Sequence, residues 1–153
     1  MNRLTRDPGN GIVLPPPPAP VANFLPCRRV GPLLFVSGQG PIDATGKRHT
    51  GKVGVDVDVA TAYQHARFAG MNVLAVAQEA LGDLERIEFV AKVLGMVNAI
   101  PTFAEHPKVI DGCSDLFGEV LGDSGRHARS AIGVGSLPGN ISVEIEAIFA
   151  VRD

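Results

Sequence analysis

The chain has few cysteines and no long apolar run. Its 153 residues include no tryptophan, one tyrosine and two cysteines. Cys27 and Cys113 are too few for the disulfide framework on which small secreted domains depend, so we expect both to be reduced. The first fifteen residues are interrupted by Asp7, Pro8 and Gly9, which predicts neither a signal peptide nor a membrane span. By elimination, the expected compartment is the cytoplasm.

Positive charge is also scarce. The formal net charge is −2, and lysines and arginines form no run. Because affinity for nucleic acids depends largely on neutralising phosphates, we expect neither DNA nor RNA as a partner. The doublet Arg28-Arg29 is more typical of a solvated surface than of a binding groove.

Motifs for metals and nucleotides are missing as well. The four histidines lie in different predicted elements, and neither cysteine has a second ligand nearby, so we expect no metal site. No glycine-rich loop with a following lysine opens a helix, which argues against a nucleotide site.

The composition that remains is typical of one globular domain. Hydrophobic residues make up 45% of the chain and charged residues 20%, far from the signature of disorder. We expect a folded domain over residues 21–153, preceded by an N-terminal arm over residues 1–20 whose proline run at 15–18 favours polyproline II. Two states of this arm remain open, a disordered tail or a segment lying on a neighbouring subunit.

Hydrophobic periodicity predicts two amphipathic helices. Apolar and small residues recur at intervals of three and four over residues 57–81 and again over residues 107–121. Gly82 and Gly122 follow these segments as stop signals.

Four segments favour strands. Residues 33–37 form a short apolar run bounded by glycines, and residues 87–97 are rich in β-branched side chains. Residues 130–134 and 141–151 follow the second helix, and the last of these alternates apolar with acidic residues. With a second strand expected before the first helix, to which no residues are assigned, the order strand, strand, helix, strand, helix, strand, strand predicts an α+β domain, with a mixed sheet and both helices on one face.

This arrangement leaves one sheet face without a cover. Glu144 and Glu146 fall on that face by alternation. Because a partly exposed sheet face is usually covered by another subunit, we expect an oligomer.

The segment 126–130 is the strongest candidate for chemistry. It carries Arg126 and Arg129 into a predicted strand, and we expect the returning strand of a hairpin to bring Glu144 alongside. The planar guanidinium of arginine binds carboxylates with two hydrogen bonds, so Arg129 is a candidate anion clamp. An Arg129–Glu144 structural ion pair is the alternative, and residue patterns leave both open.

Three motifs resemble those of the RidA/YjgF family, also catalogued as L-PSP endoribonucleases. They are Leu-Phe-Val-Ser-Gly-Gln-Gly-Pro at 34–41, Ala-Arg-Ser at 128–130 leading to Leu-Pro at 137–138, and Val-Glu-Ile-Glu-Ala-Ile at 143–148. Their order and spacing are specific, and the likeness extends over about residues 21–152. The resemblance is to a divergent branch, and it implies a chorismate-mutase-like fold and a homotrimer with sites between subunits.

The resemblance also implies an activity. RidA proteins are hydrolases, deaminases of the 2-iminobutanoate/2-iminopropanoate type, which convert 2-aminoacrylate and related imines to a 2-keto acid and ammonia without a cofactor. Carried over by position, Arg129 would hold the substrate carboxylate and Glu144 would orient or deprotonate the attacking water.

Five further positions complete the implied substrate pocket. Backbone groups near Ser37, Gly38 and Ala131 would complete the pocket. Phe24 stands where the family often has tyrosine, Asp111 where asparagine is expected, and Ala131 where a cysteine follows Arg-Ser.

Two alternatives to a deaminase remain. Phe24 and Asp111 favour a non-catalytic trimer that binds a small carboxylate in the same cleft. An endoribonuclease, as the older family name suggests, fits poorly with a net charge of −2 and 5% aromatic residues, because RNA-binding proteins use basic and aromatic surfaces.

Overall fold

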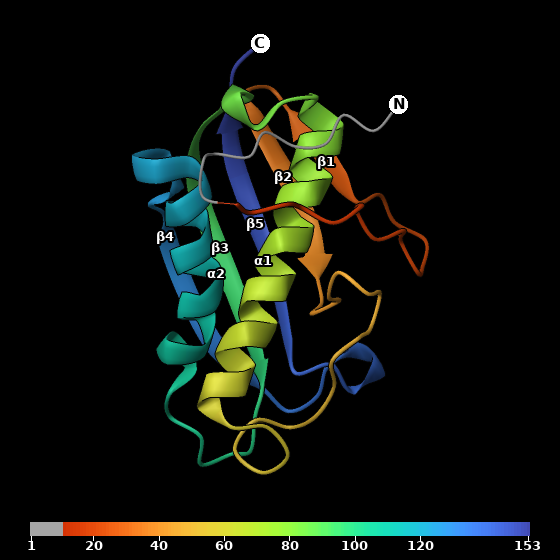
Figure 1. Cartoon of the computed structure of the whole chain (residues 1–153), viewed down its shortest axis with the longest axis vertical. Coiled ribbons are helices and arrows are strands. Elements are labelled where there is room, and N and C mark those ends of the chain that lie inside the picture. Colours follow the sequence, from red (N-terminus) through yellow and green to blue (C-terminus); the bar gives the residue numbers. More distant parts are fainter. Residues whose placement is uncertain (1–10) are drawn as a thin grey trace.

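One mixed sheet and two long helices account for the fold in the computed structural model, which describes residues 11–153 (Figure 1). The strands of the described part are β1 (Cys27–Val30), β2 (Leu33–Gln39), β3 (Ile87–Asn98), β4 (Ala128–Val134) and β5 (Val143–Val151). They lie in the order β1-β2-β5-β3-β4. The pair β3 and β4 is parallel and the other neighbours are antiparallel, which confirms the predicted mixed sheet.

The two predicted helices are confirmed. They are α1 (Val59–Leu81) and α2 (His106–Leu121), and short 3₁₀ turns follow at Leu84–Arg86, Gly122–Gly125 and Pro138–Asn140. The Asp58 side chain accepts a hydrogen bond from the Thr61 N–H at the start of α1, and Gly82 ends the helix with a φ of 82°. Both helices cover the same face of the sheet (Figure 1).

The pleat of β5 separates core from open face. Val143, Ile145 and Phe149 are buried toward the helices, whereas Glu144 and Glu146 alternate with them. The open face also carries exposed large apolar side chains on several strands, among them Phe35, Phe89 and Ile132.

The predicted hairpin between the last two strands is wrong. β3 lies between β4 and β5, and Val93 pairs with Arg129 on one side and with Ala147 on the other. The reason is the crossover through α2, which lays β4 parallel to β3 at the sheet edge, as parallel pairs require. β5 then enters the sheet between β2 and β3.

The N-terminal segment packs on its own chain. Residues 11–20 form neither helix nor strand, but Leu14 is buried in the core and Ile12 packs against it. Residues 1–10 of the expected arm lie outside the described residues. No helix in the described part is long and apolar enough to cross a bilayer.

Candidate functional site

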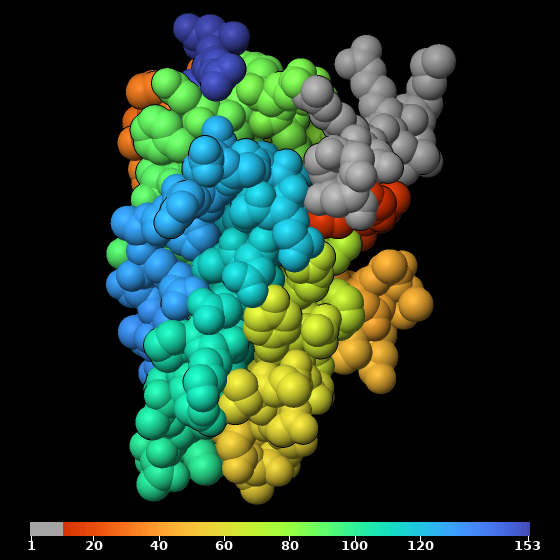
Figure 2. Space-filling model, turned by 60° about the vertical axis from the view of Figure 1, so that its left-hand side comes forward, coloured from red at the N-terminus to blue at the C-terminus, as the bar shows by residue number. Residues whose placement is uncertain are grey.

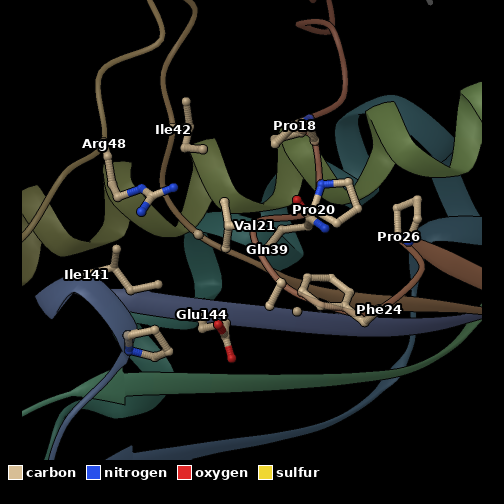
Figure 3. A pocket seen from close by; sticks show the side chains of 15 residues that line it. Pro18, Pro20, Val21, Phe24, Pro26, Gln39, Ile42, Arg48, Ile141 and Glu144 are labelled. Carbon is tan, nitrogen blue, oxygen red and sulfur yellow. The ribbon is translucent and has the colours of Figure 1, made fainter.

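A cavity of about 250 Å³ lies where the N-terminal segment meets β2 and β5 (Figure 3). Its walls are mostly apolar and come from residues 18–26 together with Ile42, Pro138 and Ile141. Gln39, Arg48 and Glu144 supply polar groups. Since sites for drug-sized ligands start at about 300 Å³, this cavity suits a small metabolite.

Glu144 reaches the cavity from the open face of the sheet. Its carboxyl group packs against Gly38, where a Cβ atom would lie 2.9 Å from the Glu144 Cδ. A register shift between Val36 and Gln39 accompanies this close approach. Burial raises the pKa of Glu144, and the nearby charge of Glu146 raises it further. A raised pKa brings this carboxyl closer to the range useful for proton transfer near neutral pH.

Ser37 holds the N-terminal segment against β2. Its Oγ donates a hydrogen bond of 2.6 Å to the Leu25 carbonyl, and its N–H donates one of 2.9 Å to the Pro26 carbonyl. These bonds fix the segment that carries Phe24, whose ring lines the cavity. Ser37 itself is not among the lining residues, so its contribution in this structure is to position the wall.

Arg129 lies on the other side of the sheet from Glu144. One nitrogen, Nη1, donates to Asp111 Oδ1 over 2.8 Å and to Ser114 Oγ over 2.9 Å, both on α2. Because Arg129 turns toward the helices and Glu144 away from them, no ion pair joins the two within one chain. The alternative of an Arg129–Glu144 structural pair is therefore wrong, and Asp111 is the acidic partner instead.

Ala131 also faces the helical layer, where it packs against the core. Within one chain the predicted site residues thus form two groups, with Phe24, Gly38 and Glu144 at the cavity and Arg129, Asp111 and Ala131 on the helix-covered side. The substrate contacts expected of the second group stay a prediction.

Sequence reasoning missed Arg48. Its segment, around residues 40–50, projects beside α1 (Figure 2), and its guanidinium extends into the cavity opposite Glu144 (Figure 3). No hydrogen bond or ion pair joins this side chain to any residue of the described range 11–153. The Gly-Lys-Arg-His stretch matches no motif, and the only signal was a cation in a segment otherwise interpreted as a turn.

Two histidines anchor the Arg48 segment to the domain. His49 Nε2 lies 2.8 Å from Asp43 Oδ2, and the His49 ring stacks on Phe68 and lies 4.7 Å from the ring of His65. His65 Nδ1 in turn lies 2.7 Å from the Ser142 hydroxyl. Burial lowers the pKa of His65 to about 4, so this ring is neutral at pH 7.

The described residues hold no group of three His, Cys, Asp or Glu side chains arranged to bind a metal ion. The cavity therefore offers one carboxyl group, one guanidinium and an apolar wall. Such a set can bind a small anion and move a proton.

Comparisons with solved structures agree with this architecture. The protein Atu1372 of Agrobacterium tumefaciens, of unknown function, is 47% identical with a TM-score of 0.87, over 93% of this chain and 87% of its own. Escherichia coli TdcF, solved with bound serine, is 25% identical with a TM-score of 0.63, over 90% of this chain and 94% of its own.

Sequence comparison gives the family. Protein TCP17 of Trypanosoma cruzi is 40% identical over 144 residues, which are 94% of this chain and 90% of that protein. The model of the family described as "YjgF/chorismate mutase-like, putative endoribonuclease" matches residues 5–150. With the chorismate-mutase-like α+β fold and the three motifs in place, the chain belongs to this family, the one also known by the names RidA and L-PSP.

Proposed function

We propose that this protein is a deaminase that hydrolyses a small carboxylate-bearing imine, such as that derived from 2-aminoacrylate, to a 2-keto acid and ammonia. The observation that carries the proposal is Glu144, a half-buried carboxyl with a raised pKa at a metabolite-sized cavity. The serine bound to the relative TdcF supports a ligand of amino-acid size.

The reaction needs little beyond positioning and a route for protons. A water molecule adds its oxygen to the electrophilic imine carbon, and Glu144 accepts the proton that this water loses. Glu144 returns this proton to the imine nitrogen, which gives a carbinolamine. It then takes the proton of the new hydroxyl group and passes it to the same nitrogen, so that the carbon–nitrogen bond breaks, ammonia leaves and the keto group forms. Imine plus water thus balances keto acid plus ammonia.

Arg129 enters this proposal through a second copy of the chain. Arg129 and Glu144 face opposite sides of one sheet, so they can act on one substrate only if different copies supply them. β4 lies at the sheet edge, and both hydrogen bonds of Arg129 use Nη1, which leaves its other nitrogens for a carboxylate. We therefore include a homotrimer with sites between copies in the proposal.

The exposed apolar side chains of the open face support such an assembly. Phe35, Phe89 and Ile132 lie uncovered on β2, β3 and β4. Covering them with another copy would remove apolar surface from water, which favours association.

Ammonia and keto-acid release from imines generated in situ by an amino-acid oxidase or a dehydratase tests the function. Glu144→Gln should abolish turnover and keep ligand binding, whereas Arg129→Ala should abolish turnover and weaken binding. Glu88→Gln, which neutralises an exposed carboxylate of the same sheet, is the matched control and should stay active. Absence of turnover from every imine by the wild type would instead indicate a non-catalytic binding protein.

A further inference from the structure

Arg48 is the one cationic side chain lining the cavity in the described part of the chain. Figure 3 shows its guanidinium pointing toward the space between Val21 and Ile141. A guanidinium has five N–H donors and stays charged at any physiological pH. Here none of these donors has a protein acceptor within the described residues, which contrasts with Arg129 and its two bonds to α2.

The nearest acidic residue of the same segment is already engaged. Asp43 accepts hydrogen bonds from the Thr45 side chain and from His49, and these bonds hold its pKa well below the usual range. Glu144 lines the same cavity, and within the described residues no ion pair joins the two side chains. The positive charge of Arg48 is therefore left for a ligand.

The wall around Arg48 indicates what the rest of that ligand is. Ile42, Val21 and Phe24 line the cavity together with prolines. Apolar walls favour ligands that bury hydrocarbon, while a few placed polar groups fix their orientation. A ligand with one anionic end and an aliphatic or aromatic body satisfies both.

We propose that Arg48 binds the carboxylate of the ligand in this cavity and that the preferred ligand carries an apolar side chain, as imines of aliphatic or aromatic amino acids do. That the ligand is an imine rests on the function proposed above, whereas the binding of such acids by Arg48 does not. A carboxylate accepts about four hydrogen bonds, so Arg48 and the Arg129 of a second copy can share one.

The segment that carries Arg48 is anchored to the domain through its backbone and through His49, while the Arg48 side chain is exposed. Arg48 pairs with Ile42 in an isolated β-bridge, and the neighbouring His49 N–H donates to the Pro41 carbonyl over 3.0 Å. The side chain of His49 is held by Asp43 and packs against His65 on α1. A fixed backbone reduces the entropy lost when the guanidinium binds an anion.

Calorimetric titration with stable product-like acids tests this assignment without turnover. We would titrate α-ketoisocaproate, its neutral amide and pyruvate into the wild type, Arg48→Gln, Arg48→Lys and Lys47→Gln. Lys47→Gln removes the same charge one residue away, from an exposed side chain that does not line the cavity. A further variant, Phe24→Ala, removes part of the apolar wall.

We expect the wild type to bind α-ketoisocaproate more tightly than pyruvate, and Phe24→Ala to reduce that preference. Arg48→Gln should weaken binding of both acids by about tenfold or more and leave the amide unchanged. Arg48→Lys should recover part of the loss, and Lys47→Gln should bind like the wild type.

Three results would overturn the assignment. They are equal affinities for acid in wild type and Arg48→Gln, equal losses in Arg48→Gln and Lys47→Gln, and no binding of any probe by the wild type. Loss of acid binding confined to Arg48→Gln, in a protein that hydrolyses no imine, would reject the deaminase proposal while supporting the role of Arg48.

Discussion

His65 makes the stability of this domain sensitive to mild acid. His65 is 5% exposed, and burial lowers the pKa of its ring from 6.5 to about 4. As the pH falls below 6.5, the unfolded chain takes up a proton at this position and the folded chain does not, so stability is lost until the pH reaches the folded pKa. Between pH 7 and pH 5 these two pKa values correspond to a loss of about 2 kcal/mol.

Urea denaturation of the wild type and of His65→Gln at both pH values measures this loss. Glutamine does not titrate and can still hydrogen-bond the Ser142 hydroxyl, so the variant should lack about 2 kcal/mol of the wild type's pH dependence. Burial also lowers the pKa of His127, but this residue titrates in both proteins and cancels in the difference. The same pH dependence in both would refute a buried neutral His65. Because the His65 ring packs against the His49 ring, which anchors the Arg48 segment, we expect this segment to detach as the stability falls at low pH.

Two further predictions test the helix packing and the assembly. A Cβ at Gly112 would overlap the backbone carbonyl of Tyr63 where α2 meets α1, so Gly112→Ala should lower the free energy of unfolding, measured in urea, by about 3 kcal/mol or more. Gly118 lies on the same helix with open space around it, so Gly118→Ala should be neutral or stabilise by up to about 1 kcal/mol. Similar costs for both variants would contradict this packing. If Arg129 and Glu144 come from different copies, refolding equal amounts of Arg129→Ala and Glu144→Gln together should restore about one quarter of wild-type turnover, because each site draws each residue independently. If turnover does not recover, either one chain supplies both residues to the same site or one of the two residues is not part of the site.

The sequence alone determined the elements of the domain. Both helices and the positions of β3 and β5 followed from apolar and β-branched patterns, because burying one face of a helix or strand imposes a repeat that is visible locally, and β2 followed from a short apolar run bounded by glycines. Helix ends followed from equally local chemistry, such as the Gly82 stop. The three motifs identified the family for the same reason, since each lies within a few consecutive residues.

Strand β1 was not placed by the sequence. Cys27–Val30 has only four residues, mostly exposed, at the edge of the sheet beside β2. An edge strand of this length has too few alternating positions for a pattern to stand out.

Tertiary structure alone decided which functional candidates meet. The motifs identify Arg129 and Glu144, but the crossover through α2 places β3 between their two strands. Because side chains alternate between the two faces along a strand, the register then places these two side chains on opposite faces of the sheet. The cavity joins Phe24, Arg48 and Glu144 from a terminal segment, a loop and the last strand. Their meeting depends on how the chain crosses over the sheet, and contacts between such distant segments leave no periodic signal in the sequence.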